Sequence, residues 1–185
     1  MKKDVTYFET INEDHSLETF ALAEQRAAEA GITKIILAST TGQTALKAMH
    51  YFAGKGITLV VIPHQYGFSS EDNRFPADIV QTLQESGHKV HFGTMLFHTE
   101  KLYGSGIPSI IADFLRCFSE GVKVCYEITL MAADAGLVKA GEAVIAIAGT
   151  GKNADTALLM RAATTRNIRK LCVDEILCKP YIRRD

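Results

Sequence analysis

Residues 34–46, KIILASTTGQTAL, pass from a β-rich run through a hydroxyl-rich turn into a helical segment. The same change from a short apolar run to a helical pattern recurs along the chain. We expect strands at 34–38, 58–62, 89–92, 143–148 and 169–173, and helices at 15–30, 43–53, 76–85, 108–118, 122–135 and 154–165. This alternation predicts an α/β domain with a largely parallel sheet that is covered on both faces.

The composition limits the classes of ligand. The chain has 185 residues, enough for one core, so we expect a single domain over 1–185. Twenty basic and 21 acidic residues give a net charge of −1, which provides no field for attracting nucleic acid or an anionic membrane. Neither a membrane helix nor an apolar leader is evident, so we expect a cytoplasmic protein. Any anionic ligand must therefore be held by local geometry.

Side chains that would mark a metal or catalytic centre are scattered. The four cysteines form no CxxC pair and are expected to be free thiols: Cys117, Cys125, Cys172 and Cys178. The histidines form no HExxH motif, so no metal site is expected. There is no G-x-S-x-G elbow, and no catalytic residue is assigned. Whether the protein is an enzyme stays open.

The first turn, 39–44, carries four hydroxyl side chains and a glycine where a helix begins. Free N–H groups in the first turn of a helix carry partial positive charge, and hydroxyls add donors, so this is the chemistry of a phosphate cradle. Ordinary N-capping, which needs only one hydroxyl, is the alternative. The candidate binding residues are Ser39, Thr40, Thr41, Gly42, Gln43 and Thr44.

The second turn, 149–156, follows the most hydrophobic strand and is expected to open the helix 154–165. Its two glycines permit a tight turn and close approach of a ligand, and Lys152 adds a cation. These features favour a ligand site over a plain strand-to-helix turn, in which glycine is also common. The candidate binding residues are Gly149, Thr150, Gly151, Lys152, Asn153, Asp155 and Thr156.

The second turn partly matches one of two nucleotide-binding motifs. Gly149, Gly151 and Ala154 fit G-x-G-x-x-G/A, and Asp174 follows 20 residues later, which nearly completes a dinucleotide fingerprint. No second nucleotide-binding half follows, so NAD-linked catalysis rests on these four residues alone. The Walker pattern fails at two positions.

Two further groups of residues have alternative interpretations. The loop 64–68 follows the second strand, where an aromatic ring could stack on a flat heterocycle and a histidine could transfer a proton; a buried aromatic anchor is the alternative. Its candidate residues are His64, Gln65, Tyr66 and Gly67. On the helix 122–135, Glu127 forms a polar stripe with Lys123 and Asp134, which predicts a solvated face. A carboxylate aimed into the ligand crevice is the alternative.

Five segments carry a family resemblance: IILASTTGQTALKAM (35–49), LVVIPHQYGF (59–68), GVKVCYEITLMAADAGLV (121–138), AVIAIAGTGKNADTALLMRAA (143–163) and VDEILCKP (173–180). In their order and combination the chain resembles the small stand-alone proteins related to the C-terminal α/β domain of pyruvate kinase, found in archaea and bacteria. The matching segments do not include the catalytic barrel of pyruvate kinase, so the resemblance does not imply kinase activity.

The resemblance implies a three-layer αβα sandwich with a mostly parallel five-stranded sheet, of order 3-2-1-4-5, whose last strand is antiparallel. This order would place strands 34–38 and 143–148 side by side, so that the turns 39–44 and 149–156 flank one crevice. The resemblance suggests flavin mononucleotide (FMN) in this crevice, with its phosphate on a helix N-terminus. In pyruvate kinase, the turn corresponding to 39–44 holds phosphate groups of a sugar bisphosphate effector.

The leading hypothesis is a small ligand-binding protein that holds a phosphorylated ligand, FMN, between the two turns. The alternatives are a flavin-dependent oxidoreductase using the same site, a phosphosugar-binding regulator, and NAD-linked catalysis. We expect neither nucleic acid nor membrane as a partner, and pairing of sheet edges into a homo-oligomer stays open.

Overall fold

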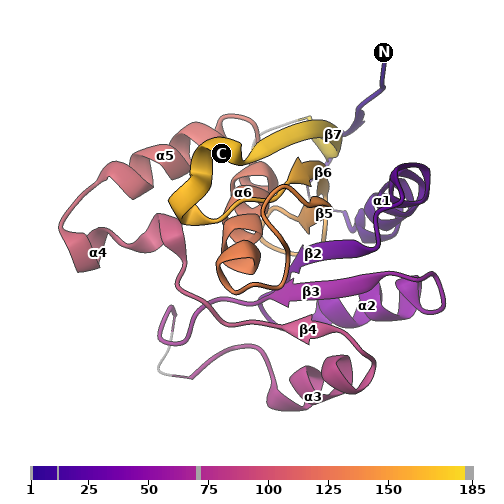
Figure 1. The fold of residues 1–185 in the computed structure, drawn as a ribbon, viewed down its shortest axis with the longest axis horizontal. Helices are drawn as coiled ribbons and strands as arrows, with labels where there is room; N and C mark the ends of the chain where they lie inside the picture. Colours follow the sequence, from indigo (N-terminus) through magenta and orange to yellow (C-terminus); the bar gives the residue numbers. More distant parts are fainter. Residues whose placement is uncertain (1, 12, 70–71, 182–185) are drawn as a thin grey trace.

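One mixed sheet organises the computed structural model, which describes residues 2–11, 13–69 and 72–181 (Figure 1). The strands follow the order β1-β7-β6-β5-β2-β3-β4 across the sheet. Their bounds are β1 Thr6–Phe8, β2 Lys34–Ala38, β3 Thr58–Ile62, β4 Lys89–Val90, β5 Ala143–Ala148, β6 Thr156–Arg161 and β7 Cys172–Pro180. The α-helices are α1 Ser16–Ala30, α2 Gln43–Phe52, α3 Ala77–Glu85, α4 Glu100–Tyr103, α5 Ile107–Arg116 and α6 Glu120–Asp134.

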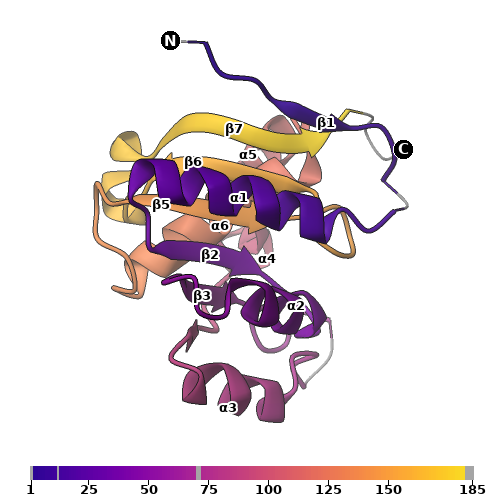
Figure 2. The same cartoon turned by 90° about the vertical axis from the view of Figure 1, so that its right-hand side faces the viewer.

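Helices cover both faces of the sheet, as expected. Helices α1, α2 and α3 lie on one face, while α6 lies on the other with α5 and α4 beyond it (Figures 1 and 2). Along β2, Ile35 and Leu37 point into the core under α1 and α2, whereas Ile36 between them points into the core under α6. A strand buried on both faces has no polar side, which explains the unbroken apolar runs in β2, β3 and β5.

The centre of the sheet has the expected register. Strand β2 pairs in parallel with β3 on one side and with β5 on the other, with Ile36 opposite Val60 and Ala146. The strands 34–38, 58–62 and 143–148 are confirmed to the residue. The turns that leave β2 and β5 therefore lie at the same edge of the sheet.

The predicted helix at 154–165 is wrong, because its central residues, 156–161, form β6. Ala, Leu, Met and Arg favour helices, but β6 pairs antiparallel with both β5 and β7. Ala157 and Leu159 pack into one core and Leu158 and Met160 into the other, which is the alternation of a strand buried on both faces. Tertiary pairing therefore overrides local helix propensity. The antiparallel fifth strand implied by the resemblance exists, but it is formed by 156–161.

The sheet has more strands than predicted. The order 3-2-1-4-5 holds for β4-β3-β2-β5-β6, but β7 and β1 extend the sheet to seven strands in the described part of the chain. The strand expected at 169–173 is β7, shifted to Cys172–Pro180 behind a 3₁₀ segment, η2, at Thr165–Lys170. β1 was not predicted, because its three residues are too few for a periodic pattern. Four of the six strand pairings are parallel.

The segment 93–107, in which neither a strand nor a helix was expected, contains short helical turns. A 3₁₀ turn, η1 (Leu96–His98), and α4 bring the chain from β4 to α5, which begins one residue before its predicted start. Phe97 and Met95 are buried, so this connection packs against the body of the molecule. Over the described ranges, no helix combines the length and apolarity that crossing a membrane requires.

Candidate functional site

A cavity of about 970 Å³ opens at the carboxyl ends of β2, β3 and β5. Parallel strands gather their outgoing loops at this edge, which is where α/β proteins bind ligands. Eleven predicted site residues line it: Ser39, Thr40, Thr41, Gln43, Thr44, His64, Gly149, Thr150, Gly151, Lys152 and Asn153. Six others do not: Gly42, Gln65, Tyr66, Gly67, Asp155 and Thr156. The structure therefore brings both predicted turns to one cavity.

The first turn leads into α2, as predicted. The Ser39 hydroxyl accepts a hydrogen bond from the Ala45 N–H at 3.4 Å, and the Thr40 hydroxyl lies 3.3 Å from Nε2 of His64. At the N-cap position of α2, no side-chain hydrogen bond is found among the described residues. Thr41 and Thr44 line the cavity beside it. One hydroxyl thus supports the turn from within, and the helix end stays open towards the cavity.

Gly42 is required by the turn itself rather than by a ligand. Its φ of +84° is a left-handed conformation that side chains rarely adopt. A Cβ atom at this position would stand 2.6 Å from Cδ1 of Ile79 on α3. The glycine therefore lets α2 begin close to α3. Gly42 faces α3, which explains why this residue does not line the cavity.

The second turn joins two antiparallel strands, so it opens no helix. Asp155, predicted as a candidate binding residue, is buried and accepts hydrogen bonds from the Thr150 N–H at 2.8 Å and the Thr156 hydroxyl at 2.7 Å. A Cβ at Gly149 would collide with the backbone carbonyl of Asn153. Asn153 itself has a left-handed backbone conformation, with φ 62°. The dinucleotide fingerprint therefore fails, since it needs a helix after the glycines. Asp174 pairs instead with Arg161.

The loop after β3 contributes fewer residues than predicted. The Gln65 side chain accepts a hydrogen bond from the Met95 N–H at 2.7 Å and so fixes the connection to η1. Tyr66 is 63% exposed and packs against Phe92, away from the cavity. Phe68 lines the cavity instead, with its ring 4.7 Å from that of His64 and 5.1 Å from that of His98. Phe68, not Tyr66, is the aromatic residue of the site.

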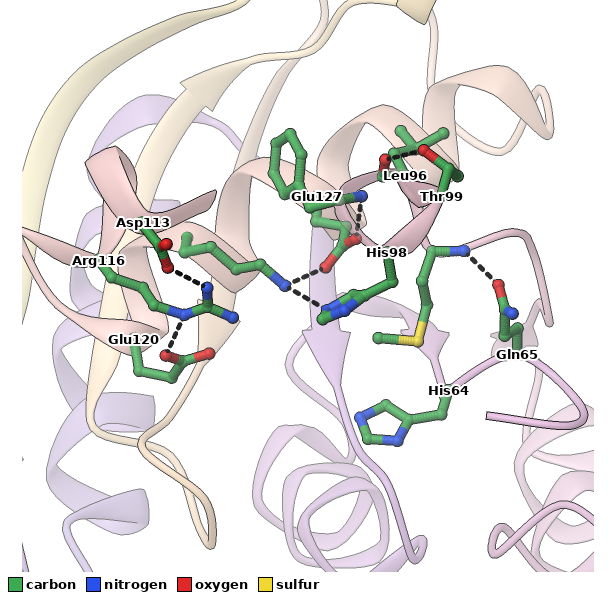
Figure 3. Close-up of polar contacts among 12 residues, drawn as sticks. His64, Gln65, Leu96, His98, Thr99, Asp113, Arg116, Glu120 and Glu127 are labelled. Atoms are coloured by element: carbon green, nitrogen blue, oxygen red, sulfur yellow. Dashed lines mark hydrogen bonds and ion pairs between the residues drawn. The ribbon is translucent and has the colours of Figure 1, made fainter. Parts of the chain in front are cut away.

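The predicted solvated stripe on α6 is wrong for two of its three residues. Lys123 and Glu127 are each 2% exposed and pair at 2.7 Å between Nζ and Oε2. Glu127 also accepts a hydrogen bond from the Phe97 N–H at 2.8 Å, and Lys123 Nζ lies 3.1 Å from Nε2 of His98 (Figure 3). This cluster of Lys123, Glu127 and His98 lines the cavity, so the alternative of an inward carboxylate is correct. η1, which the sequence did not predict, buries the pair.

Positive charge exceeds negative charge around the cavity. Its acidic lining residues, Glu120 and Glu127, pair with Arg116 and Lys123 respectively. Further basic lining residues come from other segments: Arg74, Lys152 and Lys179. A chain with a net charge of −1 thus concentrates basic side chains at one place. A cavity lined in this way attracts anions, although the whole protein does not.

Both histidines of the cavity are held in their neutral form near pH 7. Burial lowers the pKa of His64 below its usual 6.5, and the charge of Arg74 lowers it further. Burial likewise lowers the pKa of His98, with a second contribution from Lys123. Lysine only donates hydrogen bonds, so Nε2 of His98 accepts and its proton sits on Nδ1. Nδ1 of His64 is buried without a hydrogen-bond partner among the described residues.

The polar lining residues that the sequence did not predict include Arg74, His98, Arg116 and Lys123. Arg74 lies in a loop and His98 in the three-residue turn η1, and neither segment is long enough for periodicity to carry a signal. For Lys123 a signal existed, because a lysine and a glutamate four residues apart interrupt an otherwise apolar helix. Neighbours that cover a helix on all sides turn such a pair into a buried ion pair.

Comparison with known proteins places the chain in a family. The family model described as "Pyruvate kinase, alpha/beta domain" matches residues 18–161. This range covers most of the chain, so the chain belongs to that family. It extends from α1 to the end of β6, and β1 and β7 lie outside it. The resemblance stated from the sequence is therefore confirmed for the family and its α/β fold.

Solved structures similar to the chain include two pyruvate kinases from Cryptosporidium parvum. One, determined in complex with ADP, is 16% identical, with a TM-score of 0.44 over 79% of this chain and 23% of that enzyme. The other is 17% identical, with a TM-score of 0.43 over 78% of this chain and 23% of that enzyme. The chain thus spans about a quarter of the length of these enzymes.

Proposed function

We propose that this member of the pyruvate kinase α/β domain family binds a phosphorylated ligand, FMN, in the cavity between the turns after β2 and β5. The observation that carries the proposal is the N-terminus of α2, where Thr41, Gln43 and Thr44 line the cavity and, among the described residues, the Ser39 hydroxyl takes up only the Ala45 N–H of the first turn. Free N–H groups at such a helix end, together with the dipole of the helix, suit a phosphate.

The phosphate would be held by residues of both turns. Thr41, Gln43 and Thr44 supply donors at the start of α2, and Lys152 in the opposite turn supplies a cation. Asp155 fixes that turn through its bond to Thr150 and does not itself contact the ligand. Seven of the predicted residues would therefore contact or adjoin the phosphate: Thr40, Thr41, Gln43, Thr44, Thr150, Gly151 and Lys152.

The rest of the cavity suits a flat, partly polar ring system. Ile62, Val124 and Met131 give it apolar walls, and Phe68 offers an aromatic surface. His64 and Lys123, which line the cavity, add polar side chains to these walls. A cavity of about 970 Å³ lies at the upper end of the range for small-molecule and cofactor sites, roughly 300–1,000 Å³. The residues present therefore fit FMN.

A flavin-dependent oxidoreductase is the second candidate, favoured by the cluster of Lys123, Glu127 and His98. FMN supplies redox chemistry when it is bound, whereas the protein supplies position and charge. A buried ammonium in the cavity would stabilise negative charge that develops on a bound molecule. Neutral His98, held with its proton on Nδ1, could exchange a proton there.

The test is a titration of the purified protein with FMN, followed by flavin fluorescence, beside riboflavin, which has the same ring but no phosphate. We expect FMN to bind about 10–100-fold more tightly than riboflavin, because charge-assisted hydrogen bonds contribute about 1.5–3 kcal/mol. Thr41→Glu places a carboxylate at the phosphate position and should reduce FMN affinity by at least the same factor.

Thr33→Glu is the matched control. Thr33 is exposed and directly precedes β2. The substitution therefore adds the same charge at the opposite end of the same strand. It should leave FMN affinity unchanged. Equal affinities for FMN and riboflavin, or equal losses in both variants, would contradict the placement of the phosphate.

Two further measurements separate the candidate functions. Turnover of NADH or NADPH with bleaching of the bound flavin would favour the oxidoreductase over a binding protein. Binding of a sugar bisphosphate, measured directly by calorimetry, together with no binding of FMN, would favour the phosphosugar-binding regulator. Both experiments use the same protein and the same Thr41→Glu variant.

A further inference from the structure

Helix α5 exposes its apolar face to solvent. Ile107, Ile110, Ile111 and Phe114 are spaced i, i+3, i+4 and i+7, the spacing by which a helix normally faces a core. Here these four side chains are between 45% and 72% exposed. The opposite side, with Ala112 buried, packs on α6 and η1. The helix is thus turned with its large apolar side chains away from its own molecule.

Neighbouring residues extend this face at both ends into what we call the α5 surface. Leu102 and Tyr103 of α4 precede it and Phe118 follows it, each more than half exposed. Figure 1 shows α4 and α5 at the periphery of the molecule, beyond α6. Seven large side chains exposed to this degree offer on the order of 800 Å² of apolar area. That exceeds the largest apolar patch of a typical monomer, about 300–600 Å².

We propose that the α5 surface is the interface through which two copies of this chain form a dimer. An area on the order of 800 Å² is what one partner contributes to a standard stable interface. The order of residues is self-complementary. In an antiparallel pair with its twofold axis between Ile110 and Ile111, Ile107 faces Phe114 of the second copy and Ile110 faces Ile111. The large side chains of Leu102 and Tyr103 then lie towards Phe118 of the second copy.

The charges beside the α5 surface also favour a second copy over a lipid surface. Residues bordering it include Glu100 and Lys101 at one end, and Asp113 with Arg116 at the other. An amphipathic helix that lies on an anionic membrane is bordered mainly by lysine and arginine, whereas here two acidic residues accompany the two basic ones. Mixed charges at both ends allow opposite signs to meet in an antiparallel pair, in which the helix dipoles also oppose each other.

The interface is distinct from the edge-to-edge sheet pairing left open by the sequence. It lies on a helical layer and leaves the sheet edges β1 and β4 uncovered. The C-terminal end of α5 reaches the ligand cavity, because Arg116, Cys117 and Phe118 line it. A dimer built on α5 therefore stands beside the ligand site, and its existence does not depend on which ligand binds there.

Sedimentation velocity of the full chain tests the proposal. We expect the wild type to sediment as a dimer above about 10 µM, since interfaces of this size bind at micromolar concentrations or more tightly. Ile110→Glu and Phe114→Glu each bring two carboxylates to the twofold axis region and should raise the dissociation constant at least 100-fold. Leu17→Glu is the matched control, because Leu17 on α1 is 64% exposed and lies outside the α5 surface.

Circular dichroism establishes that all three variants are folded, which is expected because the substituted side chains are exposed. A wild type that stays monomeric at about 100 µM overturns the proposal. So does loss of the dimer in Leu17→Glu, because the interface would then lie elsewhere. Flotation of a monomeric wild type with phosphatidylserine vesicles would instead assign the surface to a membrane and would also overturn the proposal.

Discussion

At the scale of single residues, the decisive feature is a charge pair that the fold buries. Lys123 and Glu127 would lie on the surface of an isolated helix, but α5, η1 and the sheet leave each of them 2% exposed. Removing two charges from water is costly, and only mutual pairing and further hydrogen bonds offset that cost. The bonds to His98 and to the Phe97 N–H serve that purpose. Because both residues of this buried pair line the cavity, the pair is a candidate for contact with a ligand.

This burial predicts an asymmetry between single and double substitutions. Lys123→Met leaves the Glu127 carboxylate buried without its ion-pair partner and should lower the free energy of unfolding by about 3–5 kcal/mol. Lys123→Met with Glu127→Gln removes the charge yet keeps an acceptor for the Phe97 N–H, so most of the loss should be recovered. Urea unfolding of the wild type and the variants measures this difference.

The exposed pair Lys3–Glu29 provides the control. Lys3→Met should cost less than about 1 kcal/mol, because exposed ion pairs contribute little. If the double variant at Lys123 and Glu127 were as unstable as the sum of its single variants, the buried-charge interpretation would be wrong. If it were stable but bound FMN as tightly as the wild type, Lys123 would have no part in the site.

At the scale of elements, the helix ends are where local sequence and charge act together. Helix α1 begins at Ser16, whose N–H donates to the Asp14 carboxylate at 3.0 Å, and Lys47 of α2 pairs with the same carboxylate. Burial would raise the pKa of Asp14, but the bonds to Lys47 and Ser16 outweigh it and lower the pKa from 3.8 to about 2. Asp14 therefore joins two helices of one layer through its charge.

The lowered pKa predicts how stability depends on pH. The contribution of Asp14 is fully present above pH 3.8 and is lost as the pH falls towards 2, because the folded state holds the carboxylate ionised. Asp14→Asn keeps a hydrogen-bond acceptor but removes the charge. Since the side chain is 42% exposed, solvent screening reduces the expected loss to about 1 kcal/mol at pH 7. Thermal unfolding from pH 7 to pH 2 should show the two proteins converging at low pH; a constant difference would contradict this account.

Elements also show where sequence reasoning succeeds. Strands 34–38, 58–62 and 143–148 were predicted because each is an apolar run of strand length bounded by turn residues. The failure at β6 has a physical cause: a two-sided buried strand and a buried helix have the same composition, and only its pairing with β5 and β7 decides between them. The candidate site shows the same limit. The turns that follow strands were predicted from the local sequence, whereas the contacts contributed by η1 and α6 depend on tertiary packing and were not predicted.

At the scale of the whole molecule, one sheet separates two cores. Cys178 on β7 belongs to the core under α1 and α2, and Cys125 on α6 belongs to the core on the other face. Burial raises the pKa of Cys178 to about 12 and that of Cys125 well above its usual value. Cys117 and Cys172 are exposed. Two thiols are thus accessible, and the other two are buried, one in each core, where their reactivity reports the opening of that core.

Thiol reactivity therefore tests whether the chain is a single domain. Because the thiolate is the reactive form, Cys117 and Cys172 should react with Ellman's reagent in the native protein, whereas Cys125 and Cys178 should react only after opening. In a background of Cys117→Ser and Cys172→Ser, adding Cys125→Ser or Cys178→Ser leaves one reporter at a time. A single cooperative domain requires both reporters to become reactive at the same urea midpoint, because β2, β5 and β6 contribute side chains to both cores. Separate midpoints would mean that the two faces of the sheet unfold independently, and the single-domain prediction for 1–185 would fail.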